Sequence, residues 1–175
     1  MGQLYDADLT PSRRLDGMLL RVRQRFAALL AHAPSSAEHR AAPGSEFDSL
    51  ALAATRVLVV DDEPVQQLIT RARLAEFGIT PIQAVDGAEA VALACELPFD
   101  FSLMDLQMPV LDGLTATKQI RQFEQEHKRP RVPVVAYSTS DCSEAYVRDF
   151  GVDGVLEKPC SSVALRESLL RWCPA

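Results

Sequence analysis

From Arg56 onward, short apolar runs alternate with segments whose apolar residues recur at helical spacing. Strands that are separated by helices pair in parallel and form a sheet that is covered by helices on both faces. The pattern predicts a doubly wound α/β fold of five βα units, with the parallel strands in the order 2-1-3-4-5. The expected strands are 57–60, 80–85, 101–104, 132–137 and 152–156, and the expected helices are 64–77, 87–97, 112–126, 143–150 and 162–172.

Polar residues stand where four of these expected strands end. Asp61 and Asp62 follow the first strand, Asp105 the third, Ser138 the fourth and Lys158 the fifth. The order 2-1-3-4-5 places the carboxyl ends of the first and third strands side by side. We therefore expect the three carboxylates to share one crevice.

Three carboxylates in one crevice repel each other unless a cation neutralises them. Oxygen ligands suit Mg²⁺ or Mn²⁺ better than zinc. A metal, the ammonium of Lys158 and the hydroxyl of Ser138 around the carboxylate of Asp105 form a cradle for a transferring phosphoryl group. The carboxylate itself would be the nucleophile and would become an aspartyl phosphate. Each residue taken alone also fits an ordinary helix start, loop or turn, so the prediction depends on their combination at four strand ends.

The motifs at these strand ends together resemble a known family. They are Val59–Glu63, Met104–Gly113, Ala136–Ser138 and Lys158–Pro159. The combination resembles the receiver domain of bacterial two-component response regulators, most closely the receivers of hybrid sensor kinases, over roughly residues 56–173. The resemblance implies a flavodoxin-like fold and a signalling function.

The resemblance also implies a role for each matching residue. Asp105 would be the phosphoacceptor, and Lys158 would contact the phosphoryl group. Asp62 and Asp105 would bind Mg²⁺ (or Mn²⁺) directly, Asp61 largely through water, and Gln107 through its backbone carbonyl. Ser138 would be the switch hydroxyl that moves toward the phosphoryl group.

The sequence departs from the family pattern at several places. Val155 replaces the aromatic residue usual in the fifth strand, and Tyr137 is a candidate for part of that role. Thr139 is bulkier than the small residue usual there, so we expect slower arrival and slower hydrolysis of the phosphoryl group. The segment 138–151 is slightly short, which predicts a short fourth helix. Ser102 is unusual in a buried strand, and we expect its hydroxyl to bond to its own backbone.

Residues 1–33 are predicted to form an N-terminal amphipathic helix segment, 34–55 a flexible linker and 56–175 the receiver domain. The apolar face of this helix consists of Leu15, Met18, Leu19, Val22, Phe26, Leu29 and Leu30, and arginines cover the opposite face. Three roles remain open for this helix: packing on its own domain or on a second copy, binding a partner protein, or binding an anionic membrane surface. The linker is rich in Pro, Gly and Ser, and its run Gly44–Phe47 also fits a junction between two joined pieces.

Charge and composition limit which classes of partner and which cellular location the sequence is compatible with. Residues 1–55 carry six acidic and six basic residues, and residues 56–175 carry eighteen and twelve, so the whole net charge of -6 belongs to the second part. An acidic domain argues against direct binding of nucleic acid. The sequence shows no secretion signal and no apolar stretch long enough to span a membrane, and its four cysteines lack metal-ligand spacing. We therefore expect a cytoplasmic protein.

These observations predict a phosphoacceptor rather than an enzyme, with only slow self-dephosphorylation. Its expected phosphodonor is a histidine kinase or a histidine phosphotransfer protein, and we expect no attached C-terminal output domain. A homodimer or a partner protein would be contacted through the N-terminal helix. A haloacid-dehalogenase-like phosphohydrolase is less compatible, because it needs a second aspartate where Gln107 stands. A phosphorylation-independent scaffold that acts through protein contacts is the remaining alternative, because of Val155 and Thr139.

Overall fold

A parallel five-stranded sheet forms the centre of the part of the chain that the computed structural model describes, residues 52–139 and 143–173. Its strands lie in the order β2-β1-β3-β4-β5, which confirms the predicted fold class and strand order. The predicted N-terminal helix and nearly all of the linker lie outside the described residues. The strands are β1 (Val57–Val60), β2 (Ile82–Ala84), β3 (Phe101–Met104), β4 (Val134–Ser138) and β5 (Gly154–Glu157), and the helices are α3 (Pro64–Ala75), α4 (Gly87–Glu96), α5 (Gly113–Glu126), α6 (Glu144–Arg148) and α7 (Ser162–Trp172).

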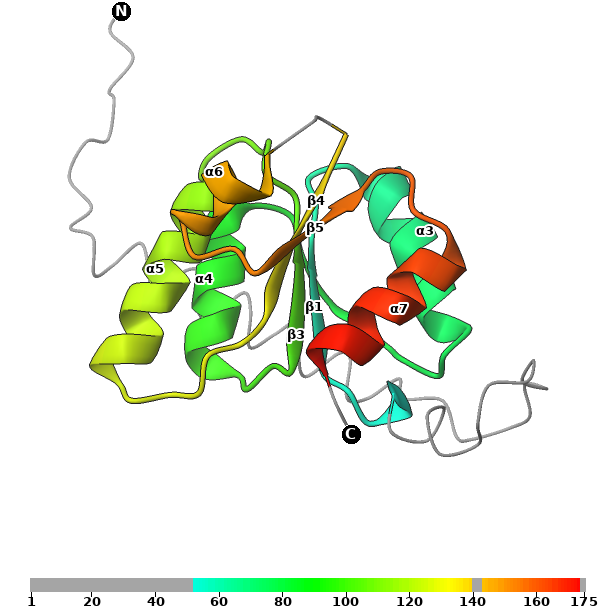
Figure 1. Cartoon of the computed structure of the whole chain (residues 1–175), viewed down its shortest axis with the longest axis horizontal. Coiled ribbons are helices and arrows are strands. Elements are labelled where there is room, and N and C mark those ends of the chain that lie inside the picture. The colour runs from blue at the N-terminus through cyan, green and yellow to red at the C-terminus, as the bar shows by residue number, and fades with distance from the viewer. Residues whose placement is uncertain (1–51, 140–142, 174–175) are drawn as a thin grey trace, which may run out of the picture. The chain divides into compact units, whose positions relative to one another are not determined.

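Helices cover both faces of the sheet: α3 and α7 lie on one face, and α4, α5 and α6 lie on the other (Figure 1). Because side chains alternate along a strand, each central strand contributes apolar residues to both sides. Val57 and Val59 of β1 belong to the larger core cluster, together with Leu74 of α3 and Leu165 of α7. A smaller cluster on the other face includes Ala136, Leu106, Val147 and Val152.

Three strands begin later than predicted, and the fifth of the sheet covers Gly154–Glu157 instead of 152–156. The second strand covers Ile82–Ala84 instead of 80–85, and the fourth begins at Val134 instead of 132. Pro81 and Pro133 immediately precede these strands, and proline has no N–H to donate to a neighbouring strand. The short fourth helix is confirmed, because α6 has only 5 residues.

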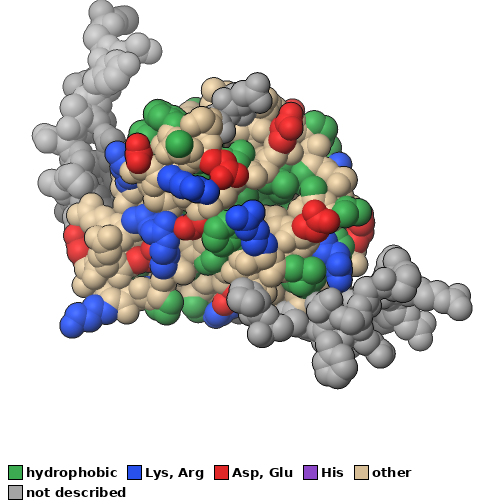
Figure 2. Space-filling model, in the orientation of Figure 1, with side chains coloured by type: hydrophobic (Ala, Val, Ile, Leu, Met, Phe, Trp, Pro, Cys, Tyr) green, Lys and Arg blue, Asp and Glu red, His purple; other side chains and the backbone are tan. Residues whose placement is uncertain are grey.

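On the face shown in Figure 2, acidic and basic side chains are interspersed with apolar ones. This mixture is typical of a solvated surface. Within the described residues, none of the helices combines the length and the hydropathy that a membrane crossing requires.

Candidate acidic crevice

The three predicted carboxylates meet at the carboxyl edge of the sheet. Asp61 and Asp105 directly follow β1 and β3, and the pairing of Val60 with Met104 brings the two strand ends level. Only 1% of Asp61 and 9% of Asp105 is exposed, whereas Asp62 is exposed. One possible ligand atom from each of these three residues lies within 4.8 Å of the others. The crevice that the strand order predicts is therefore present.

Lys158 bridges the two buried carboxylates. Its Nζ donates to Asp61 Oδ2 at 2.5 Å and to Asp105 Oδ2 at 2.6 Å, and only 8% of the residue is exposed. Burial by itself lowers the pKa of Lys158, but the hydrogen bonds and charges of Asp105 and Asp61 outweigh burial and raise that pKa above its usual value. Lys158 is therefore a fixed positive charge beside the expected phosphoacceptor.

The second oxygen of each buried carboxylate is held by the backbone two residues further on. Glu63 N donates to Asp61 Oδ1 and Gln107 N donates to Asp105 Oδ1, both at 3.0 Å. This local bond is typical of aspartate at a turn. It fixes both side chains so that their remaining oxygens face Lys158. The side chain of Gln107 is exposed, and the role of its backbone carbonyl as a metal ligand remains a prediction.

The loop after β3 is tightly packed because Gly113 begins α5 directly against Asp105. A Cβ at Gly113 would lie 1.9 Å from the carbonyl oxygen of Asp105, far inside contact distance. Asp112 caps the same helix by accepting from Thr115 N at 2.9 Å. The backbone of Asp105 is therefore held between β3 and the first turn of α5.

Ser138 is the last residue of β4 and is buried, with 2% exposed. Its carbonyl oxygen accepts from Lys158 N at 2.9 Å, so the ends of β4 and β5 are joined beside the crevice. Thr139 is exposed, and residues 140–142 lie outside the described part. The switching role of Ser138 remains a prediction.

Two expectations about neighbouring residues are wrong. Tyr137 belongs to the larger core cluster, whereas Val155 packs against the smaller cluster on the opposite face of the sheet. Tyr137 therefore does not occupy the place of the missing aromatic residue, because Val155 pairs with Ala136 of β4 and adjacent residues of a strand point to opposite faces. The hydroxyl of Ser102 does not bond to its own backbone: it is buried and lacks any hydrogen-bond partner in the part of the chain that the structure describes.

The donor set of the crevice fits a hard divalent cation. Three carboxylates and one ammonium give a formal charge of -2, from three negative groups and one positive group. A divalent cation would neutralise this charge, and exclusively oxygen ligands match Mg²⁺ or Mn²⁺. The crevice therefore contains a buried carboxylate, a fixed cation beside it and a set of oxygen ligands that fits such a metal.

Five exposed apolar side chains in α3 and in the loops after β2 and β3 were not anticipated from the sequence. Val65 (59% exposed) and Leu68 (66%) lie in the first half of α3, and Val110 (84%) lies in the loop after β3. Ile69 and Val85 are also exposed. We call these five residues the α3 surface. Helical periodicity identified α3, but which of its apolar residues stay uncovered depends on neighbouring elements.

Comparison with known proteins agrees with this geometry. The family model of the response regulator receiver domain matches residues 57–170. The autoinducer 1 sensor kinase/phosphatase LuxN of Vibrio campbellii is 35% identical over 138 residues, which make up 78% of this chain and 15% of LuxN. The sensor histidine kinase GacS of Pseudomonas protegens is 35% identical over 137 residues, 76% of this chain and 15% of GacS. The aligned part of this chain thus spans about a seventh of these relatives' length.

Solved receiver domains have the same fold. The receiver domain of sensor histidine kinase PA1611 from Pseudomonas aeruginosa, with magnesium in its active site cleft, has a TM-score of 0.62 at 32% identity, covering 69% of this chain and 98% of that one. The receiver domain of histidine kinase CKI1 from Arabidopsis thaliana, complexed with Mg²⁺ and BeF₃⁻, has a TM-score of 0.62 at 31% identity (71% and 95% covered). A third match is a co-crystal structure of the Saccharomyces cerevisiae phosphotransfer protein Ypd1 with the receiver domain of Ssk1. Its TM-score is 0.64 at 31% identity, covering 68% of this chain and 88% of that one.

Proposed function

Because the chain belongs to the response regulator receiver family, we propose that Asp105 accepts a phosphoryl group from a phosphohistidine of a kinase or phosphotransfer protein. The observation that carries this proposal is the position of Lys158, whose Nζ lies between the carboxylates of Asp61 and Asp105. In the transfer, a carboxylate oxygen of Asp105 forms a bond to phosphorus while the bond from phosphorus to the donor imidazole breaks. The imidazole leaves with the electron pair of that bond.

Asp61, Asp62, Asp105 and the backbone carbonyl of Gln107 would hold Mg²⁺ or Mn²⁺. When bound, the cation supplies positive charge that offsets the charge on the phosphoryl oxygens. Lys158 supplies the fixed positive charge on the other side and exchanges its contact with Asp105 for one with the phosphoryl group. Ser138 would then donate its hydroxyl to the same group, which couples phosphorylation to the loop after β4. The exposed Thr139 beside it would slow both the arrival and the hydrolysis of the phosphoryl group.

Intact mass after incubation with acetyl phosphate and Mg²⁺ tests the proposal. We expect wild type to gain one phosphoryl group and Asp105→Asn to gain none. Asp149→Asn, at an exposed aspartate that ends α6, is the matched control and should be phosphorylated like wild type. An unmodified wild type that binds Mg²⁺ would refute the proposal and favour the phosphorylation-independent scaffold.

We further propose that the donor protein docks on the α3 surface. A phosphohistidine reaches Asp105 only if its protein covers the rim of the crevice, and exposed apolar side chains at a rim are typical of protein contacts. The co-crystal of Ypd1 with the Ssk1 receiver shows that a relative contacts a phosphotransfer protein.

Leu68→Asn tests this docking surface. It should slow phosphotransfer from purified histidine phosphotransfer domains, while acetyl phosphate still phosphorylates the protein. Val163→Asn is the matched control, because Val163 of α7 is equally exposed (65% against 66%) but lies outside the α3 surface. Equal transfer rates for both variants would contradict docking there.

A further inference from the structure

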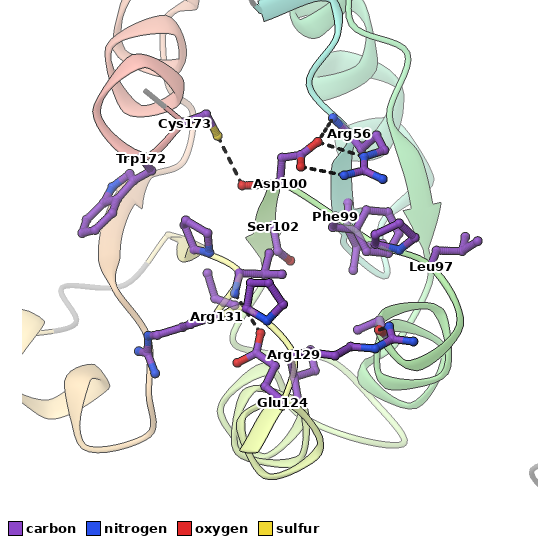
Figure 3. A pocket seen from close by; sticks show the side chains of 18 of the residues that line it. Arg56, Leu97, Phe99, Asp100, Ser102, Glu124, Arg129, Arg131, Trp172 and Cys173 are labelled. Atoms are coloured by element: carbon purple, nitrogen blue, oxygen red, sulfur yellow. Dashed lines mark hydrogen bonds and ion pairs between the residues drawn. The ribbon is translucent and has the colours of Figure 1, made fainter. Parts of the chain in front are cut away.

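A cavity of about 730 Å³ lies at the amino-terminal edge of the sheet, at the opposite end of β3 from Asp105 (Figure 3). We call it the amino-edge cavity. Residues at or near the beginnings of β1, β3 and β4 and the ends of α4, α5 and α7 line it, and its apolar lining includes Leu58, Phe99, Ile120, Phe123 and Trp172. Its volume falls within the range of small-molecule sites, about 300–1,000 Å³.

A buried polar group inside this cavity lacks a partner. Ser102 is only 2% exposed, and its Oγ has no hydrogen-bond partner within the described residues. In Figure 3 its side chain lies among the lining residues, below Asp100 and above Arg129 in this view. Buried hydroxyls are normally satisfied, because leaving one unpaired costs free energy. A ligand that reaches Ser102 would supply the missing hydrogen bond.

The charge at the rim is positive once the ion pairs are counted. Arg56 is paired with Asp100, and Arg131 is paired with Asp153. Arg129 has no carboxylate within ion-pair distance among residues 52–139 and 143–173. Its contacts are a long bond of 3.4 Å from Nη1 to Ala94 O and a position 5.2 Å from the centre of the Phe123 ring. Neither contact neutralises its guanidinium.

The remaining polar groups of the lining do not supply a compensating anion. Glu124 accepts from buried Arg121 at 2.7 Å and from Val132 N at 2.8 Å, so both of its oxygens are occupied. Burial raises the pKa of the Cys173 thiol to about 11, so that thiol stays neutral at pH 7, and it donates to Asp100 O at 3.3 Å. Among the described residues, the amino-edge cavity therefore combines an apolar interior with the unpaired hydroxyl of Ser102 and the unneutralised cation of Arg129.

We propose that the amino-edge cavity binds a small organic acid with an apolar body. Phe99 and Phe123 would contact the apolar body, Ser102 would hydrogen-bond to a polar atom within it, and Arg129 would pair with the carboxylate. This site is separate from the acidic crevice and does not depend on phosphorylation of Asp105.

Fluorescence titration with anilinonaphthalene sulfonate, an apolar aromatic anion, tests the site in the 175-residue chain without a phosphodonor. We expect saturable binding with one probe per chain, displaced by decanoate but at least about threefold less effectively by the neutral decanol, because only the carboxylate can pair with Arg129. Near-ultraviolet circular dichroism checks that the protein stays native during the titration. A signal that does not saturate, or that appears only as the native spectrum is lost, would overturn the proposal.

Variants assign the binding to the named residues. Ser102→Ala and Arg129→Gln should each weaken probe binding about three- to tenfold, the loss expected for one hydrogen bond or one charged contact. Lys118→Gln is the matched control, because Lys118 is an exposed cation of α5 that does not line the cavity, and the variant's affinity for the probe should equal that of wild type. Ala94→Leu, which adds bulk to the lining, should reduce binding as well. Unchanged affinity in both Ser102→Ala and Arg129→Gln would exclude the site.

Discussion

At the scale of single residues, two buried hydroxyls differ in whether they have a partner. Thr117 Oγ1 donates to Gly113 O at 2.7 Å within α5, whereas Ser102 Oγ in β3 has no partner in the described structure. Both residues are at most 2% exposed. The same chemical change, removal of a hydroxyl, should therefore have opposite effects at the two positions.

We expect Ser102→Ala to raise the free energy of unfolding by about 1 kcal/mol, because it removes an unpaired buried polar group. Thr117→Val should lower it by about 1 kcal/mol, because it removes a formed hydrogen bond. Urea unfolding of both variants measures the two changes. If Ser102→Ala lowered the free energy of unfolding as much as Thr117→Val does, Ser102 would have to be hydrogen-bonded in solution.

At the scale of elements, three helices end with the same pair of backbone bonds but with different residues at the turn. In α5, Arg129 N donates to Glu124 O at 2.9 Å and Lys128 N donates to Gln125 O at 3.3 Å. The equivalent turns after α3 and α6 use glycine, with φ of 76° at Gly78 and 91° at Gly151, whereas Lys128 adopts a φ of 51°. A residue with a Cβ is strained there.

Lys128→Gly should therefore raise the free energy of unfolding by about 0.5–1 kcal/mol. Gly151→Ala makes the reverse change and should lower it, because the new Cβ would also lie 2.7 Å from Arg121 Cγ. Thermal and urea unfolding provide the comparison. A destabilised Lys128→Gly would mean that the contacts of the lysine side chain outweigh the strain of its backbone.

Asp153, just before β5, connects three elements through ion pairs and a backbone bond. Its Oδ2 accepts from Arg121 Nη2 and from Val134 N, both at 2.8 Å, and its Oδ1 accepts from Arg131 at 2.7 Å. The side chains of Arg121 and Asp153 are 8% and 14% exposed, so this pair is largely shielded from water.

Asp153→Asn should lower the free energy of unfolding by about 3 kcal/mol, because it leaves the charge of buried Arg121 only partly compensated. Asp100→Asn is the control, since the pair of Arg56 with Asp100 is 53% and 39% exposed and such pairs contribute less than about 1 kcal/mol. The difference between the two urea midpoints measures the effect of burial. Similar losses of unfolding free energy in both variants would show that the buried pair stabilises the fold no more than the exposed pair does.

At the scale of the whole molecule, the acidic crevice connects cation binding to folding stability. Asp61, Asp62 and Asp105 are brought within 4.8 Å only when the first and third strands pair, so the unfolded chain lacks the site. A cation that binds only the folded state stabilises it by mass action, about 2.7 kcal/mol at a concentration one hundred times its Kd. Mg²⁺ should therefore raise the melting temperature in a saturable manner.

Asp62→Asn should reduce this effect of Mg²⁺ and raise the melting temperature in its absence, because it removes one of three mutually repelling carboxylates. Differential scanning calorimetry with increasing MgCl₂ compares it with wild type. Asp149→Asn should respond to Mg²⁺ as wild type does. An Mg²⁺ response that is the same in all three proteins would indicate non-specific ion effects and not a site in the crevice.

Local residue patterns were sufficient to predict much of the fold and of the acidic crevice. The alternation of apolar runs and helical segments predicted the sheet and its order, since strand and helix periods depend on neighbouring residues. The same order predicted that Asp61, Asp62, Asp105 and Lys158 meet, because each lies within two residues of the end of a parallel strand. The bounds of β2, β4 and β5 were less accurate. At β2 and β4, Pro81 and Pro133 limit pairing with a strand that is distant in sequence.

The amino-acid sequence by itself determined the five βα units, the strand order and the contents of the acidic crevice, because a strand end places its next residue at the edge of the sheet whatever surrounds it. Only the tertiary structure decided that Ser102 lacks a partner among the described residues, that Tyr137 and Val155 lie on opposite faces, and that Arg129 borders a cavity of about 730 Å³. These features depend on how side chains from separate elements fill, or fail to fill, the space between them. No local pattern encodes that space.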